Sequence, residues 1–453
     1  RQRQMCIRDR KYILIILCCL TSFPLWSYNV NMIVEHYSVD QGLPNNTVNC
    51  TLKDRDGFIW FGTWYGLCCF DGVKFKTFNK QEHDSDVPPR KIQRIVEDKN
   101  GYIWVKTIDR KLYVFNKVTE CFHAVYDDMK NYSENIQVIK LQNTAEGDVL
   151  LLTKDKNLLL AGVDEKGQVT IKILFDSRDE INKHDYTLKH HVLCETEEYI
   201  SWIGTDYKVS AVHKGAELAS RPADFITSKI NSGDKDSFTS FFEDGRKVWV
   251  GDRAGIFYSI DVRTGLVNRY VLSEIKGAIS NLLVTPAGYV YLSVAGQGTY
   301  EYDLAERRLQ KINTEMNDAM VTHAFIDQYD KIWFHENEKA LIYYDPLNHT
   351  AKRFPFTMFG KITTLYSEDA GERGLFFLSP AGEAWLFDRE HAEMVYINKL
   401  KQLSNDRANQ QFYHLMLDND GVLWLSSADE GVYCMNFTLS LIHISEPTRR
   451  TPI

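Results

Sequence analysis

The stretch Asp54-Arg-Asp-Gly-Phe-Ile-Trp-Phe-Gly-Thr-Trp-Tyr-Gly-Leu-Cys-Cys-Phe-Asp71 recurs in degenerate form along the chain. It joins an Asp-x-x-Gly turn to two short runs of β-branched and aromatic residues. The positions that match Trp60 are 60, 104, 150, 202, 249, 291, 333, 377 and 424. Successive positions lie 42 to 52 residues apart, a period typical of four-stranded β-propeller blades. Alternating, aromatic-rich segments argue against helical solenoids of similar period.

Each repeat predicts four strands, which in the first unit cover 48–52, 58–62, 67–70 and 75–78. The Asp54 side chain should accept backbone N–H groups in the turn, where Gly57 supplies a positive φ. We expect the tryptophans at the Trp60 position to be buried between neighbouring blades. Trp64 lies beyond the second strand and should be partly exposed. The predicted fold class is therefore all-β, a β-propeller of four-stranded blades.

Composition agrees with a large globular β protein. The 453 residues are 44% hydrophobic, 13% aromatic and 25% charged, which excludes collagen, wholesale disorder and a small disulfide scaffold. The net charge of −8 is a poor match for nucleic acid. No Cys-x-x-Cys pair occurs. Buried free thiols are the first interpretation of Cys50, Cys68 and Cys69, and a disulfide from Cys50 to Cys68 or Cys69 stays open.

The two ends of the chain differ from the rest. Residues 1–10 and 440–453 can both be back-translated to one DNA element in opposite orientations, and that element resembles a sequencing adapter. We expect translated adapter on a gene fragment, with natural termini as the alternative. Residues 11–27 combine a basic flank with a short apolar run and are typical of a secretory signal peptide. Export to the periplasm is the expected localisation.

A second stretch, Tyr37-Ser-Val-Asp-Gln-Gly-Leu-Pro-Asn-Asn-Thr-Val48, precedes the first repeat. Together with that repeat it resembles the two-component regulator propeller family, over nearly all of 33–436. The resemblance implies the periplasmic sensor region of a hybrid two-component histidine kinase, with two seven-bladed propellers, a β-sandwich, a membrane helix and a kinase. The later parts do not follow residue 436, so membrane anchoring and the kinase would belong to a missing C-terminal part. The resemblance also implies a homodimer in the full-length sensor.

Ring closure sets the expected domain boundaries. Residues 33–38 precede the first repeat and are well placed to supply the fourth strand of the last blade of a ring. Seven units would close over 28–350, and 351–439 would form two blades of a truncated second propeller. A single eight- or nine-bladed propeller is the alternative.

Catalytic and metal motifs are mostly missing. The runs at 54–57 and 418–421 begin like a calcium loop but lack its third acid and closing Glu. Neither a zincin His-Glu-x-x-His motif nor a Gly-x-Ser-x-Gly elbow occurs. We therefore expect no catalytic residues, no metal and no cofactor in this fragment. Paired carboxylates for glycoside cleavage depend on three-dimensional spacing and stay open.

The loops between the second and third strands of each blade should gather on one face of the propeller. They contain aromatic and charged residues, a mixture that suits sugar rings and hydroxyls. The candidate ligand-binding residues are Trp64, Tyr65, Arg110, Tyr207 and Arg253, accompanied by Asp109, Asp206, Gln297, Glu336 and Asn337. The expected function is non-catalytic sensing of oligosaccharides that controls polysaccharide utilisation. An exported propeller enzyme, either a polysaccharide lyase or a glycosidase, and a protein-interaction propeller are the alternatives.

Overall fold

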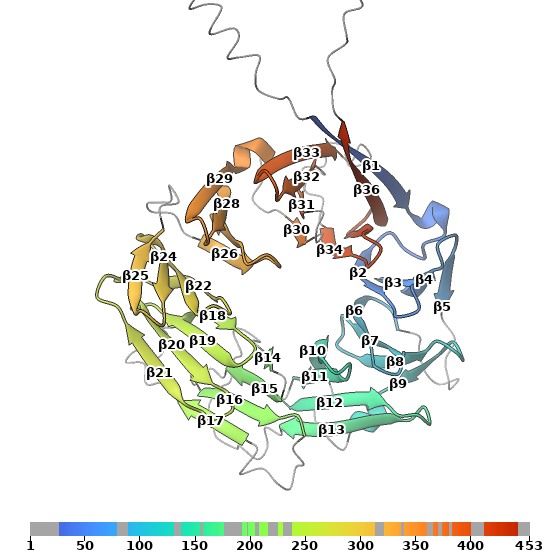
Figure 1. Cartoon of the computed structure of the whole chain (residues 1–453). Coiled ribbons are helices and arrows are strands. Elements are labelled where there is room, and N and C mark those ends of the chain that lie inside the picture. Colours follow the sequence, from blue (N-terminus) through green and yellow to red (C-terminus); the bar gives the residue numbers. More distant parts are fainter. Residues whose placement is uncertain are drawn as a thin grey trace, which may run out of the picture.

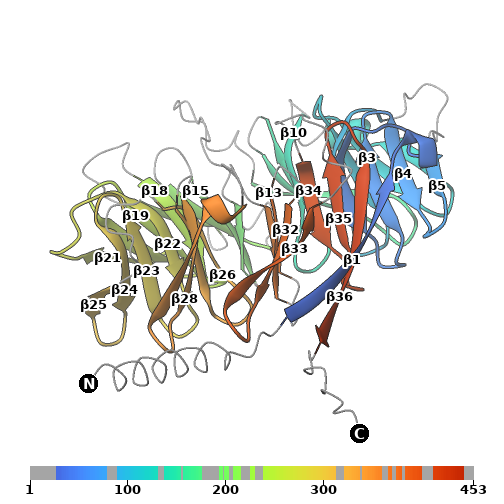
Figure 2. The ribbon, with the colours of Figure 1, turned by 90° about the horizontal axis from the view of Figure 1, so that it is seen from above.

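The described strands form nine four-stranded antiparallel sheets, which confirms the all-β class (Figures 1 and 2). In each of the first eight sheets four consecutive strands pair in chain order. The computed structural model describes residues 27–78, 89–130, 137–154, 157–175, 193–196, 198–203, 208–215, 225–229, 238–312, 321–336, 339–359, 366–369, 374–379, 383–399 and 412–442.

We number the sheets 1 to 9 in chain order. Sheets 1 to 3 contain β2 (Val48–Lys53), β3 (Ile59–Thr63), β4 (Gly66–Phe70) and β5 (Phe75–Phe78); β6 (Ile92–Glu97), β7 (Ile103–Thr107), β8 (Leu112–Asn116) and β9 (Cys121–Ala124); and β10 (Val138–Asn143), β11 (Val149–Thr153), β12 (Leu158–Val163) and β13 (Val169–Phe175). Sheets 4 to 6 contain β14 (Leu193–Glu195), β15 (Tyr199–Ile203), β16 (Lys208–His213) and β17 (Phe225–Lys229); β18 (Phe238–Glu243), β19 (Lys247–Asp252), β20 (Ile256–Asp261) and β21 (Val267–Val271); and β22 (Ile279–Val284), β23 (Tyr289–Val294), β24 (Gly298–Asp303) and β25 (Arg308–Lys311). Sheets 7 to 9 contain β26 (Val321–Ile326), β27 (Ile332–Glu336), β28 (Ala340–Asp345) and β29 (Thr350–Pro355); β30 (Tyr366–Asp369), β31 (Leu375–Leu378), β32 (Glu383–Asp388) and β33 (Glu393–Lys399); and β34 (Phe412–Leu417), β35 (Leu423–Ser427), β36 (Val432–Ile442) and β1 (Ser27–Tyr37).

The helices of the described chain are short. They are α2 (Tyr126–Met129), η1 (Val39–Gln41) and η3 (Phe356–Phe359). None of the helices in the described ranges has the length and apolarity that a membrane crossing requires. Except for Ser27, the expected signal peptide lies outside the described residues.

The expected partner of the closing strand is wrong. β1 pairs with β36 of sheet 9 along its whole length, from Ser27 opposite Ile442 to Tyr37 opposite Val432. Sheet 7 has β29 as its own fourth strand. Side chains favour this pairing, because His36 stacks on Tyr433 with ring centroids 4.5 Å apart. The N-terminal strand therefore completes the ninth sheet, and its partners include residues 440–442.

A hydrogen bond from the repeat tryptophan to the turn aspartate recurs in five sheets. Asp54 Oδ1 accepts the backbone N–H groups of Asp56 (3.0 Å) and Phe58 (2.9 Å), which confirms the predicted turn. Its other oxygen, Oδ2, accepts the indole N–H of Trp60 at 2.7 Å. Equivalent bonds join Trp104 to Asp98 (2.8 Å), Trp249 to Asp244 (2.7 Å), Trp333 to Asp327 (3.2 Å) and Trp424 to Asp418 (3.0 Å). One carboxylate thus fixes both the turn and the buried ring.

The repeat tryptophans share one burial state, as predicted. Their exposed fractions are 3% for Trp60, 0% for Trp104, 2% for Trp249, 0% for Trp333 and 5% for Trp424. The side chain of Trp202 lies outside the described residues. The rings pack between sheets: Trp60 of sheet 1 meets Phe115 of sheet 2, and Trp424 of sheet 9 meets Phe61 of sheet 1. Sheet-to-sheet burial of these rings is a main source of stability.

The cysteines of sheet 1 are free thiols. Cys68 and Cys69 belong to different core clusters on the two faces of β4, as their vicinal positions predict. Burial raises the pKa of Cys50 to about 12, and the pKa values of Cys68 and Cys69 are raised to the same extent for the same reason. These thiols are therefore protonated and unreactive at neutral pH.

Candidate functional site

The connections between second and third strands lie at one edge of the sheets, which we call the loop edge. Backbone hydrogen bonds join these connections from sheet to sheet. Lys91 N–H donates to the Trp64 carbonyl, Ile108 N–H donates to the Lys91 carbonyl, and Val138 N–H donates to the Arg110 carbonyl, each at 2.9 Å. The loops of sheets 1, 2 and 3 therefore form a continuous, hydrogen-bonded rim.

Two aromatic side chains are presented on this rim in sheet 1. Trp64 is 44% exposed, as predicted, and its neighbour Tyr65 is 61% exposed. Thr63 Oγ1 donates to the Gly66 carbonyl (2.8 Å) and accepts the Tyr65 N–H (3.2 Å), so the loop has a defined conformation. Lys91 Nζ lies 5.3 Å from the centre of the Trp64 ring, within cation–π range. The result is an exposed aromatic platform with a cation beside it.

Arg110 lies on the corresponding loop of sheet 2. Its backbone adopts a φ of 67°, in the left-handed region, and its side chain is exposed. The hydrogen bond from Val138 to the Arg110 carbonyl holds this conformation against the next sheet. Arg110 therefore belongs to the same rim as Trp64 and Tyr65.

The remaining candidates are not all brought together. Arg253 is exposed on the loop of sheet 5, across the arrangement from sheet 1 in Figure 1. Gln297 has a structural role, because its Oε1 accepts the Lys276 N–H at 2.7 Å. Glu336 is buried and bonded to Arg353 at 2.9 Å. The candidates that lie outside the described residues are Tyr207, Asp206 and Asn337.

Sequence reasoning missed a buried lysine directly behind the rim. Lys106 ends up 6% exposed on β7, at the repeat position that other sheets fill with Gly62, Gly251, Ser293 and Ser426. A Cβ on Gly62 would lie 2.4 Å from Cys50 Sγ, which explains why small residues recur there. Sheets 3 and 7 hold Leu152 and His335 at this position, so an alignment of the repeats would have shown Lys106 as the one lysine among these residues.

Lys106 faces another cation. Arg94 on β6 is its direct cross-strand partner, and like charges placed opposite each other destabilise a sheet. Gln93 Oε1 accepts a hydrogen bond from Lys106 Nζ at 2.7 Å. Burial lowers the pKa of Lys106 to about 8, and the charges of Arg110 and Arg94 contribute to the same shift. We call Lys91, Arg94, Lys106 and Arg110 the cation cluster.

Carboxylates do not neutralise the cation cluster within the described ranges. None of its four members forms an ion pair with a described acidic side chain. The acid on the same loop, Asp109, accepts a hydrogen bond from Thr107 Oγ1 and lies 3.4 Å from Lys111 Nζ. Positive charge at this part of the loop edge is therefore not compensated by the described chain.

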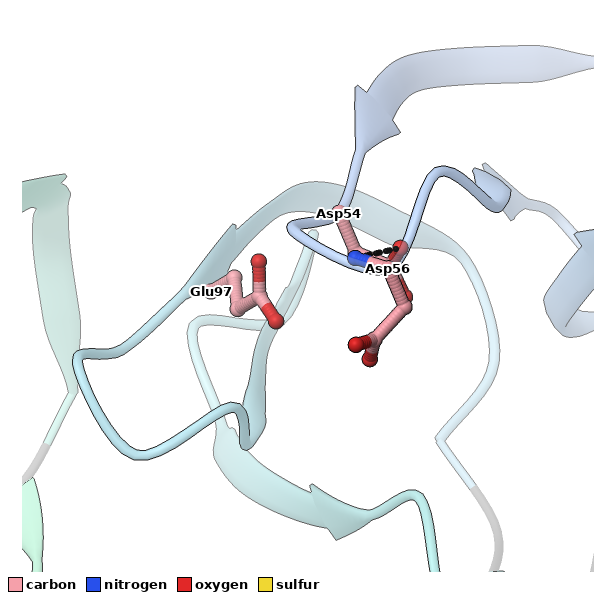
Figure 3. A group of neighbouring side chains, drawn as sticks. All are labelled: Asp54, Asp56 and Glu97. Carbon is pink, nitrogen blue, oxygen red and sulfur yellow. Dashed lines mark hydrogen bonds between the residues drawn. The ribbon is translucent and has the colours of Figure 1, made fainter.

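The opposite edge of the sheets, which we call the turn edge, carries the one described group of acids spaced like metal ligands. Asp54, Asp56 and Glu97 meet between sheets 1 and 2 (Figure 3). Lys117 Nζ lies among them, 3.1 Å from Asp54, 2.6 Å from Asp56 and 2.8 Å from Glu97. Burial alone would lower the pKa of Lys117, but the hydrogen bonds that Lys117 donates to the three carboxylates outweigh burial and raise that pKa. An ammonium group thus fills the position that a cation would take.

Similar cations bridge other pairs of sheets at the turn edge. Arg389 of sheet 8 bonds to Asp327 of sheet 7 (2.5 Å) and to Asp369 of its own sheet (2.7 Å). Lys53 of sheet 1 contacts Asp418 of sheet 9 at 3.5 Å, and it also bonds to Asp420. Charges at this edge therefore hold the sheets together.

The first repeat matches a known family of proteins. Residues 42–65 match the two-component regulator propeller family. The match includes the turn Asp54-x-x-Gly57, Trp60 and the exposed pair Trp64 and Tyr65, and it confirms the resemblance drawn from the sequence. No curated protein sequence matches the chain.

Several solved structures are similar to the chain at low identity. The extracellular domain of a putative one-component system from B. thetaiotaomicron is 15% identical, with a TM-score of 0.38, and the match covers 90% of this chain and 66% of that one. A putative hybrid two-component system from the same organism gives 15% identity and a TM-score of 0.34, over 88% and 58% of the two chains. A streptogramin B lyase gives 10% identity and a TM-score of 0.40, over 90% and 98%. The chain therefore spans less than two thirds of the length of the two extracellular domains.

Proposed function

We propose that this chain is the ligand-sensing part of a periplasmic two-component sensor and is not itself an enzyme. The propeller repeat at 42–65 supports the sensor assignment. Two described lysines with shifted pKa values, Lys106 and Lys117, belong to a cation cluster and to an ion-pair bridge. Neither arrangement places an acid and a base around a common reacting atom.

The proposed ligand is an oligosaccharide bound at the loop edge of sheets 1 and 2. The observation that carries this proposal is the exposed pair Trp64 and Tyr65 on a hydrogen-bonded loop. Flat aromatic rings stack on the apolar faces of sugars, while neighbouring polar groups bond to the hydroxyls. Arg110 lies on the same rim. Arg253 and Tyr207 stay predictions for other loops of that edge.

Isothermal titration calorimetry of the purified chain against plant and host oligosaccharides tests the function. At least one sugar should bind without being cleaved, and chromatography of the mixture should recover it intact. Trp64→Ala should weaken binding at an unchanged melting temperature. A product peak would instead establish an exported enzyme, and a folded chain that binds no sugar would contradict the proposal.

Signal transfer would follow from dimerisation in the full-length sensor. A ligand that favours one of two dimer arrangements shifts their populations by the difference in its affinity for them.

The division into units 28–350 and 351–439 is a separate proposal. The pairing of β1 with β36 links the two units, because it places residues 27–37, at the start of the first unit, in the last sheet of the second unit. If the units fold separately, limited proteolysis should degrade 351–439 first and leave 28–350 intact. A single nine-sheet unit should instead resist cleavage evenly, because ring closure protects sheet edges.

A further inference from the structure

Within the cation cluster Lys91, Arg94 and Arg110 are exposed, but the buried charge of Lys106 is an electrostatic cost that the described chain does not offset. Lys106 is nearly fully buried and Arg94 stands directly opposite it on the adjacent strand. Burying a charge is unfavourable unless an opposite charge or strong hydrogen bonds compensate it. Gln93 supplies one neutral oxygen. At the equivalent position sheets 1 and 5 hold glycine and sheets 6 and 9 hold serine, so the fold itself does not require this lysine.

Basic residues also lie on the first strands of other sheets. Residues that face the Lys106 position from the first strand are Arg94, Lys140, His323 and His414 in sheets 2, 3, 7 and 9. First strands of several neighbouring sheets contact each other, among them β2 with β6 and β2 with β34, and Figure 1 shows the first strands around the centre of the arrangement. Burial lowers the pKa of His414, and the charge of Arg94 adds to that effect from two sheets away. The charge of Arg94 therefore acts on both Lys106 and His414.

From this arrangement we infer that the loop edge binds an anionic oligosaccharide, with Lys106, Arg94 and Arg110 contacting its carboxylate or sulfate groups and Trp64 stacking on a sugar ring. The inference rests on the proposed function and narrows its ligand class. Arginine forks and lysine ammonium groups are the side chains that bind such anions most strongly. The bound anion would supply the negative charge that the described residues lack.

The affinity should depend on pH through Lys106. The groups around Lys106 are Gln93 and Arg94 on β6 and Arg110 on the loop, and Arg94 in turn acts on Cys50 of β2 and His414 of β34. Lys106 loses its proton near pH 8, whereas a sugar carboxylate stays ionised throughout the neutral range. Binding should therefore weaken from pH 7 to pH 9, and at pH 8 it should be accompanied by proton uptake.

Calorimetry on the full chain tests the inference with charged and neutral sugars of matched shape. The probes are oligogalacturonate and its methyl ester, alginate and hyaluronan oligomers, a sulfated carrageenan oligomer and neutral maltotriose. An anionic probe should bind at least tenfold more tightly than its neutral counterpart. Binding of carboxylated but not sulfated probes would assign the anion as a uronate, and the reverse would assign it as a sulfate ester.

Variants separate this site from general charge effects. Arg110→Gln and Lys106→Gln should each weaken anion binding roughly tenfold, the loss expected for a charged hydrogen bond. Arg110→Lys should retain part of the affinity. Arg263→Gln removes an exposed arginine from the turn edge of sheet 5 and should change affinity less than twofold. Lys106→Gln should also abolish the pH dependence.

Three outcomes would overturn the inference: equal binding of ester and acid, no effect of Arg110→Gln, or no binding of any anionic probe. If neutral sugars still bind and Trp64→Ala weakens them, the proposed sensing function stands without the anion site. If folded protein binds no sugar of either kind, both proposals fail. Thermal melting of every variant distinguishes lost binding from lost folding.

Discussion

The two edges of the sheets use positive charge in opposite ways. At the turn edge, Lys117 is surrounded by Asp54, Asp56 and Glu97, and Arg389 and Lys53 likewise bridge neighbouring sheets. At the loop edge, Lys106 faces Arg94 and has no described acid as a partner. Removing one partner of a buried ion pair destabilises the fold, and burying an unpaired cation costs free energy. The difference separates residues that hold the sheets together from residues that are available to a ligand.

The largest effect should come from the core that both edges share. Trp249→Ala should lower the free energy of unfolding by about 3–5 kcal/mol, as for other large-to-small core changes. It also leaves Asp244 without its indole donor. Trp64→Ala at the loop edge is the matched control and should change that free energy by about 0.5 kcal/mol or less. Denaturant unfolding measures both, and equal losses would place Trp64 in the core.

Removal of Lys117 and removal of Lys106 should change stability in opposite directions. Lys117→Met leaves Asp54 and Glu97 without their ammonium partner and should cost about 2–4 kcal/mol, because an uncompensated buried charge remains. Lys106→Met keeps the length of the side chain, removes the like-charge pair with Arg94, and should stabilise the protein. The free energy of unfolding should rise by about 1–3 kcal/mol, because the pKa of Lys106 is lowered from 10.5 to about 8 and one pKa unit corresponds to about 1.4 kcal/mol. If Lys106→Met instead destabilises the protein, a described residue already neutralises the charge of Lys106.

The stability difference between Lys106→Met and the unchanged chain should depend on pH. The folded pKa of Lys106 is about 8 and the unfolded value is 10.5. Between these values the unfolded chain binds a proton that the folded chain has released, so stability of the unchanged chain rises with pH. The unchanged chain should therefore be less stable than Lys106→Met by the full amount at pH 7, and the difference in the free energy of unfolding should shrink towards pH 10. A pH-independent difference would mean that Lys106 does not titrate in this window.

The smallest effect should come from an exposed charge at the turn edge. Arg55 lies 3.2 Å from Glu97 with its side chain 46% exposed. Arg55→Gln should therefore cost about 0.2–1 kcal/mol, the usual range for surface pairs, and the part of the loss that comes from the ion pair should vanish in high salt. The stability losses of Arg55→Gln and Lys117→Met should be compared at low and high salt. A loss for Lys117→Met that persists in high salt would show that the Lys117 bridge depends on burial and not on charge alone.

The sequence by itself determined the repeat and its four strands. Asp54, Gly57 and Trp60 specify a turn and a buried ring through local geometry and side-chain size, so spacing alone predicted them. The same local logic placed Trp64 beyond the second strand and predicted its exposure, which at 44% is confirmed. It also predicted that Cys68 and Cys69 face opposite sides, because side chains alternate along a strand.

Only the tertiary structure decided which distant residues meet. The pairing of β1 with β36 joins segments about 400 residues apart, and each has the same local pattern as other fourth and third strands, so periodicity could not choose the partner. The bond from each tryptophan to its aspartate requires the turn to fold back on the ring, although their spacing of five or six residues recurs in the sequence. Lys106 looked like one charge among 53 basic residues until the register placed Arg94 opposite it. Electrostatic energy depends on separation and burial in space, and neither follows from the order of residues along the chain.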